Sequence, residues 1–235
     1  MKKLIPLLII IISIKITMGF NEIYPLESPA NSYYQVKKTV AIPDTINHKK
    51  TSCFYDQLSD KYYYQVNVLR SGKEDNLSGP DSLIINISDK SDYKLRQTIG
   101  IKPGYLFHDS YSNCDAVKSY ITNFYKDNDV FEYPYAELII ADFNFDSLED
   151  FAIMVDEGGN TGAGYRYFIQ DSSGLFHEDN FLSDEMMYFP VEIDSKNKIL
   201  KTLVHKDAFG AYEKEYKYDV KKKSWKFIKQ TYRGK

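Results

Sequence analysis

The chain has 235 residues, a formal net charge of −3, and contents of 43% hydrophobic and 27% charged residues. This composition supports a folded core, in one large domain or two small ones. The mildly acidic balance excludes the usual basic surface of nucleic-acid-binding proteins. The run Lys221–Lys223 is interpreted as a solvated turn between strands.

Residues 1–19 have the pattern of a secretory signal peptide. Two lysines precede the apolar run 4–14, and small residues up to Gly19 follow. The run is shorter than the about 20 residues that a membrane span needs, so no span is expected after cleavage. An uncleaved N-terminal anchor is the alternative. The predicted location is periplasmic or secreted.

The chain has two cysteines, Cys53 and Cys114. In an exported protein these favour a single disulfide, because the compartment is oxidising. The alternative is a pair of buried free thiols. Their spacing is not that of a metal site.

The predicted domain organisation is a loosely structured segment over 20–60, which is polar and holds three prolines, and one all-β domain over 61–235. Short apolar alternations bounded by turn residues predict strands, and their regular spacing favours a sandwich, barrel or propeller. The predicted strands are 62–68, 83–87, 93–99, 137–141, 151–155, 165–170, 175–181, 199–205, 212–218 and 225–230.

One short helix is predicted over 113–126. Apolar residues recur there at i, i+3, i+4 and i+7, which is one face of a helix, at Val117, Tyr120, Ile121 and Phe124. Asn113 is in the position of an N-cap.

The most informative motif is an acidic loop between two predicted strands. Oxygen-bearing residues occupy its positions 1, 3, 5 and 9, and a main-chain carbonyl is available at position 7, which is the pattern of a Ca²⁺ loop. The predicted ligands are Asp142, Asn144, Asp146, the carbonyl of Leu148, and Asp150.

This loop is not an EF-hand, because Ile153 stands where that loop requires a bidentate Glu and no flanking helices are predicted. Ser147 occupies the position where such loops prefer Gly. A positive φ at Ser147 would cost about 1 kcal/mol. The expected affinity for Ca²⁺ is therefore modest, about 10⁻⁴ to 10⁻³ M, as in extracellular modules. A metal-free Asp-rich turn is the alternative.

The segment 158–164 holds four glycines and is followed by Tyr165 and Tyr167. No Gly-Lys-Ser/Thr sequence ends it, so it is not a phosphate loop. It is interpreted either as a partner-binding loop with an aromatic anchor at its base or as a hairpin connection with both tyrosines packed on the sheet.

The sequence does not predict an enzyme. The four histidines are scattered, and neither a zinc-ligand spacing nor a Gly-x-Ser-x-Gly nucleophile motif is present.

The residues from Leu138 to Phe151, the following glycine-rich loop, the Tyr-x-Tyr strand and the strands around Trp225 resemble a known family over about residues 80–231. The family comprises periplasmic calcium-binding inhibitor (immunity) proteins of type VI secretion peptidoglycan hydrolases, which are related to periplasmic inhibitors of invertebrate-type lysozyme. The segment 83–99 resembles the family's early hairpin.

This resemblance implies an irregular propeller-like fold of short antiparallel hairpins, one bound Ca²⁺, and a loop that blocks a cell-wall hydrolase. The implied partner-binding residues are Thr161, Gly162, Gly164, Tyr165 and Tyr167, with Tyr165 as the inhibitory side chain. The alternative function is a calcium-stabilised adhesion or glycan-binding module without inhibitory activity.

Overall fold

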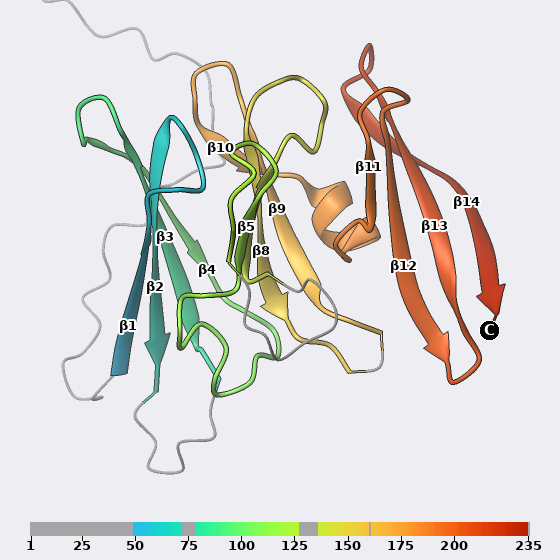
Figure 1. Cartoon of the computed structure of the whole chain (residues 1–235), viewed down its shortest axis with the longest axis horizontal. Helices are drawn as coiled ribbons and strands as arrows, with labels where there is room; N and C mark the ends of the chain where they lie inside the picture. Colours follow the sequence, from blue (N-terminus) through green and yellow to red (C-terminus); the bar gives the residue numbers. More distant parts are fainter. Residues whose placement is uncertain (1–48, 72–78, 127–135, 160, 235) are drawn as a thin grey trace, which may run out of the picture. The chain divides into compact units, whose positions relative to one another are not determined.

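The structure is a computed structural model that describes residues 49–71, 79–126, 136–159 and 161–234. The predicted signal peptide, 1–19, lies outside the described residues, as does most of the segment 20–60. The described part is all-β, as predicted, with three sheets that follow one another in the chain (Figure 1). Within it, no helix is long and apolar enough to span a membrane.

The first sheet is a four-stranded antiparallel meander in the order β1-β2-β3-β4. Alternate residues of β2 and β3 are buried, because successive side chains of a strand point to opposite faces. Strand β1 lies inside the segment that was predicted to be loose, so that prediction is wrong for its last residues. The strands are β1 (Lys49–Tyr55), β2 (Tyr62–Arg70), β3 (Ser82–Asp89) and β4 (Leu95–Ile101).

The second sheet has six strands in the order β10-β9-β8-β7-β5-β6. Its central strands β7 and β8 are buried on both faces, apart from the last residue of β8, which explains their nearly continuous apolar sequence. The strands are β5 (Val117–Ser119), β6 (Tyr125–Lys126), β7 (Leu138–Ala141), β8 (Asp150–Asp156), β9 (Gly164–Gln170) and β10 (Phe176–Glu178), and a short π-helix, η1 (Phe181–Met186), follows.

The helix predicted over 113–126 is wrong. Cys114 and Asn123 have positive φ values of 56° and 57°, which interrupt any right-handed helix. The backbone between them pairs instead with β7 in parallel register, and Tyr120 N donates to Ile140 O at 2.8 Å. The apolar spacing of this segment therefore belongs to a bent strand rather than to a helix face.

The third sheet is a second four-stranded meander, β11-β12-β13-β14, in which the predicted strands 199–205, 212–218 and 225–230 are confirmed. Four-stranded antiparallel sheets are the blade unit of propellers, whereas a propeller-like arrangement of the three sheets stays a prediction. The strands are β11 (Glu192–Asp194), β12 (Ile199–Asp207), β13 (Gly210–Asp219) and β14 (Ser224–Gly234).

Aromatic side chains connect the three sheets through one continuous core. Toward the first sheet, Phe151 of β8 packs edge-on against Tyr64 of β2, with ring centroids 6.0 Å apart. Toward the third, Phe181 of η1 stacks on Trp225 of β14 at 6.5 Å. The middle sheet therefore contributes apolar side chains to both interfaces, and each aromatic pair adds about 1 kcal/mol beyond its buried area.

Candidate functional site

The acidic loop joins β7 to β8, and its polar side chains turn inward on its own backbone. Asp142 accepts hydrogen bonds from Asp146 N at 3.0 Å and from Ser147 N at 2.9 Å. Asn144 Oδ1 lies 3.1 Å from the same Asp146 nitrogen. The oxygens of Asp142 and Asn144 therefore converge on one point, and the Asn144 amide also donates to Asp146 Oδ2 at 2.9 Å.

Two non-glycine residues in this loop have left-handed backbone angles. Phe145 has a φ of 61°, and Ser147, where the sequence analysis expects this strain, has a φ of 70°. Such angles cost about 1–2 kcal/mol per residue. Phe143 and Phe145 offset part of this cost by burial: Phe143 lies 5.1 Å from the Tyr167 ring and Phe145 lies 6.0 Å from the Trp225 ring.

Asp150 closes the loop from its last position. Its Oδ2 accepts from Phe143 N at 2.8 Å and from Asn144 N at 3.3 Å, and its Oδ1 accepts from Gln170 N at 2.9 Å. Burial raises the pKa of this carboxyl well above its usual range, while the amide donors act in the opposite direction. The hydrogen bonds of Asp150 therefore fix the loop to the last residue of β9.

The donor set has the chemistry that Ca²⁺ requires, because carboxylate and amide oxygens of Asp142, Asn144 and Asp146 are gathered in one turn. Burial, with the like charge of Asp146, raises the pKa of the Asp142 carboxyl, and a bound cation would act against that shift. Within the described ranges, no group of three His, Cys, Asp or Glu side chains has the geometry of a metal site. Calcium binding, including through the Leu148 carbonyl, stays a prediction.

The acidic loop also connects all three sheets. Glu149 is buried and accepts hydrogen bonds from Ser59 Oγ at 2.6 Å and from Tyr64 OH at 3.1 Å, both in the first sheet or its connections. On the other side, Lys198 Nζ lies 5.2 Å from the Phe145 ring centroid and donates to Phe145 O at 3.4 Å. Any ligand that orders this loop will therefore stabilise the whole described fold.

Glu149 was not predicted as a functional residue, because it stands at an even position of the loop where no ligand is expected. Its hydrogen-bond partner Ser59 is 90 residues away in the chain. Burial raises the pKa of the Glu149 carboxyl, against the effect of the Ser59 and Tyr64 hydroxyls. No local pattern identifies such a residue, because both partners belong to another sheet.

The glycine-rich loop connects β8 to β9, and its two tyrosines are packed in the core, as the interpretation of a hairpin connection expects and that of an exposed aromatic anchor does not. Tyr165 is 1% exposed and donates its hydroxyl to Ala136 O at 3.0 Å. Tyr167 is fully buried and donates to Tyr188 O at 2.9 Å. Both side chains belong to the core, since β9 is paired on either side, so neither enters a partner's cleft from this position. Gly164 is buried with them.

The exposed part of this loop is its tip. Gly159 and Thr161 are exposed and Gly162 is half-buried, whereas residue 160 lies outside the described ranges. Gly158 has a φ of 56°, and its Cα faces Gly162 O so closely that a Cβ has no room. Gly158 N also donates to Asp156 Oδ1 at 2.6 Å. The tip is therefore held in a narrow turn.

Two exposed aromatic residues lie beside the base of this loop. Tyr105 and Phe107 are 61% and 49% exposed and pack edge-to-face with ring centroids 5.4 Å apart. Their segment is fixed to the end of β8, because Glu157 N donates to Tyr105 O at 2.8 Å and Phe107 N donates to Glu157 Oε2 at 2.7 Å. The sequence analysis did not single out this pair.

The acidic loop and the glycine-rich loop lie at opposite ends of β8, which runs from Asp150 to Asp156. Seven residues of extended strand separate the two loops by about 20 Å. A cation in the acidic loop therefore affects the glycine-rich tip through β8 and β9 rather than by direct contact.

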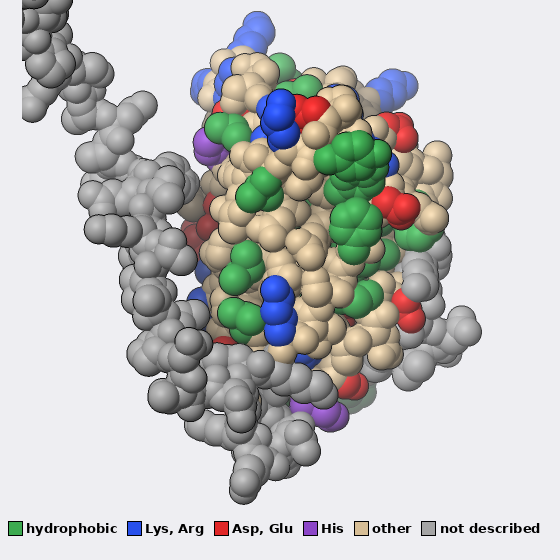
Figure 2. Space-filling view, turned by 90° about the vertical axis from the view of Figure 1, so that its left-hand side faces the viewer, with side chains coloured by type: hydrophobic (Ala, Val, Ile, Leu, Met, Phe, Trp, Pro, Cys, Tyr) green, Lys and Arg blue, Asp and Glu red, His purple; other side chains and the backbone are tan. Residues whose placement is uncertain are grey.

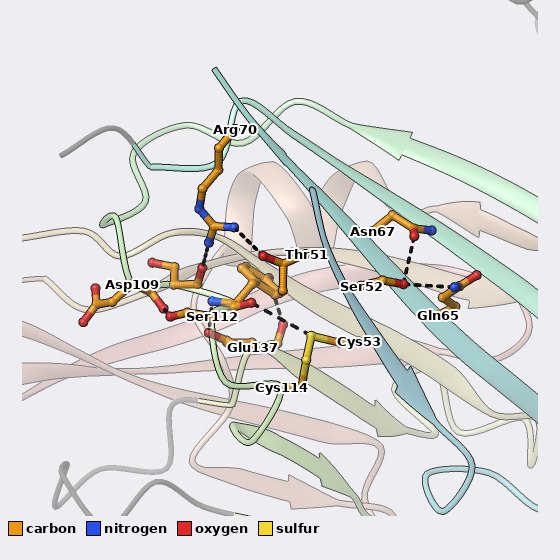
Figure 3. The surroundings of a disulfide bond; sticks show 12 residues. Thr51, Ser52, Cys53, Gln65, Asn67, Arg70, Asp109, Ser112, Cys114 and Glu137 are labelled. Atoms are coloured by element: carbon orange, nitrogen blue, oxygen red, sulfur yellow. Dashed lines mark hydrogen bonds between the residues drawn. A yellow bond between two sulfur atoms is a disulfide. The ribbon is translucent and has the colours of Figure 1, made fainter. Parts of the chain in front are cut away.

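The structure joins Cys53 of β1 and Cys114 in a disulfide (Figure 3). Beside it, Arg70 Nη1 donates to Thr51 Oγ1 at 3.3 Å and Arg70 Nη2 donates to Ser110 O. Glu137 lies close by, accepts from Tyr111 N, and has its pKa raised to about 7 by burial. This polar cluster fixes the connection 102–116 against the first two sheets.

In comparisons with known proteins, no family and no curated sequence matches this chain. A solved structure described as a Xanthomonas type IV secretion system related protein has a similar fold. The TM-score is 0.53 at 14% sequence identity, and the match covers 78% of this chain and 82% of that one. This similarity extends through most of the described sheets.

Proposed function

We propose that this protein is an exported inhibitor of a peptidoglycan hydrolase or lysozyme, stabilised by Ca²⁺ in the acidic loop. A role connected with bacterial secretion is supported by the description of the Xanthomonas protein that shares the fold. The disulfide between Cys53 and Cys114 suits an oxidising compartment outside the cytoplasm.

The observation that carries this proposal is the exposed part of the glycine-rich loop, at Gly159 and Thr161, with the exposed aromatic pair Tyr105 and Phe107 fixed to its base. Gly158, Gly159 and Gly162 have no side chain, so the backbone can approach a partner closely. Hydrogen bonds hold the base of the loop, which limits the conformational entropy lost on binding. The two aromatic rings provide the buried contact area that anchors protein interfaces. Inhibition is steric: the tip occupies the cleft and excludes the glycan substrate.

The test uses a glycine at which a large side chain leaves the fold intact. Gly159 has open space around its Cα and no positive φ, so Gly159→Arg places a long charged side chain on the tip without strain. Thr231 is exposed on β14 in the third sheet, and Thr231→Arg is the matched control, which adds the same side chain to a different surface.

The assay measures clearing of purified peptidoglycan by an invertebrate-type lysozyme and by a set of bacterial muramidases and amidases. We expect the wild type and Thr231→Arg to inhibit at least one enzyme equally, and Gly159→Arg to inhibit at least about tenfold less, since about 1.4 kcal/mol of binding is then lost. Equal inhibition by both variants would show that the tip is not the contact. If the wild type inhibits none of the tested enzymes, the proposed function is refuted.

A further inference from the structure

The outer face of the first sheet carries mostly uncharged side chains. The strand register places three cross-strand rows on this face: Tyr63, Ser88 and Leu95; Phe54, Gln65, Asn86 and Thr98; and Ser52, Asn67, Ile84 and Gly100. None of these residues is charged, whereas the next row, Lys50, Leu69 and Ser82, holds one lysine, and Lys90 Nζ lies 5.3 Å from the Tyr63 ring centroid. Figure 2 views this side of the molecule and shows a broad field of tan atoms with separate groups of green side chains and a few blue and red side chains among and around them.

The middle of this face is a connected network of amides and hydroxyls. Ser52 Oγ donates to Asn67 Oδ1 at 3.0 Å and accepts from Gln65 Nε2 at 3.0 Å, as the right-hand side of Figure 3 shows. Asn86 Nδ2 donates to Gln65 Oε1 at 3.3 Å, and Thr98 Oγ1 donates to Asn86 Oδ1 at 2.9 Å. These bonds fix the orientation of each amide, while every amide group keeps further donor or acceptor capacity.

A row of stacked aromatic rings borders this network. Phe54 lies 5.4 Å from Tyr63, and Tyr63 lies 5.6 Å from Tyr93, with interplanar angles of 29° and 17°. Phe54 and Tyr93, at the two ends, are 61% and 74% exposed. Phe54 also lines a half-open hollow of about 460 Å³, whose other lining residues, among them Leu58, Cys114 and Val117, lie toward the second sheet rather than on this face.

We infer that this outer face of β1–β4 binds an uncharged glycan chain. Sugar hydroxyls donate and accept hydrogen bonds at once, as the amide and hydroxyl groups of the network do, and the apolar C–H faces of pyranose rings pack against aromatic rings. A nucleic acid would need a cluster of cations, whereas Lys50 and Lys90 lie at opposite ends of this face. A protein partner would need an apolar patch at the centre of the interface. The centre of this face is instead occupied by the amide side chains. Glycan binding by this face does not depend on the proposed inhibition, which is assigned to the glycine-rich loop between β8 and β9.

The test removes the aromatic row and leaves the strands intact. The double variant Phe54→Ser/Tyr63→Thr keeps residues that strands accept and leaves Tyr93 unchanged, because its φ of 59° makes it a poor site for substitution. The control is Phe227→Ser/Tyr232→Thr, which removes two exposed aromatic residues from β14 in the third sheet. The probes are insoluble chitin in a sedimentation assay and chitohexaose in an NMR titration.

We expect the wild type and the β14 control to sediment with chitin and the double variant to bind at least fivefold less. Chitohexaose should shift the side-chain amide signals of Gln65 and Asn86. Hydrolase inhibition by the double variant should equal that of the wild type, which separates this face from the proposed inhibitory loop. The inference is overturned by a wild type that does not bind chitin or chitohexaose, by equal losses in both variants, or by a dimer in sedimentation velocity that only the double variant abolishes.

Discussion

The disulfide between Cys53 and Cys114 gives the most quantitative prediction. The bond spans 61 residues and fixes β1 to the connection that precedes β5. In the chain-entropy model, loss of a cross-link of this length destabilises the folded state by about 4 kcal/mol. Cys53 is also buried, and replacing its sulfur by hydrogen adds about 1 kcal/mol of lost packing.

We therefore expect the double variant Cys53→Ala/Cys114→Ala to lose about 5 kcal/mol of unfolding free energy, or about 10 °C or more in Tm. Urea unfolding followed by the fluorescence of Trp225, the one tryptophan, measures this directly. Each single variant should lose nearly as much as the double, because either substitution removes the whole bond. A reducing agent should destabilise the wild type and leave the double variant unchanged.

Two results would refute this reasoning. The first is a loss below about 1 kcal/mol in the double variant, which is less than the lower part of the range for native cross-links. The second is additivity, in which the two single losses sum to the double loss, since independent sites add and bonded partners do not.

Two further predictions concern the acidic loop and the buried carboxyl of Glu137. Addition of about 10 mM Ca²⁺ to chelator-treated protein should raise the unfolding free energy by about 1.5–2.5 kcal/mol if the affinity is that of extracellular modules. Asp146→Asn, which keeps the acceptor for Leu148 N, should abolish the gain; a melting temperature that ignores both Ca²⁺ and chelator would exclude the site. Burial raises the pKa of Glu137 from 4.5 to about 7, so the folded state binds the proton more tightly and stability should fall by about 3 kcal/mol as the pH rises through that interval. Glu137→Gln should flatten this part of the pH–stability curve; an unchanged slope would show that Glu137 is not the group responsible.

Local sequence patterns were sufficient for the all-β class and for several individual strands. The meander β12–β14 was predictable because alternating apolar residues and turn residues are both short-range signals. The acidic loop was recognisable because its oxygen-bearing residues are neighbours in the chain. Its positive φ at Ser147 follows from the same turn geometry.

Predictions failed where a residue's environment is made by distant segments. The apolar spacing of 113–126 fits a helix, but Val117 and Ser119 pair with Leu138 and Ile140 of β7, and burial of that pairing outweighs local propensity. Tyr165 suits an exposed anchor by composition, but the carbonyl of Ala136 and the neighbouring strands place it in the core.

The sequence by itself determined the class of the fold, the position of the acidic turn and the pairing expected of the two cysteines. Only the tertiary structure decided that Glu149 joins the acidic loop to the first sheet, that the base of the glycine-rich loop lies beside Tyr105 and Phe107, and that uncharged residues of β1–β4 share one face. Strand alternation acts over two residues, whereas register and burial are set by contacts between segments up to 90 residues apart.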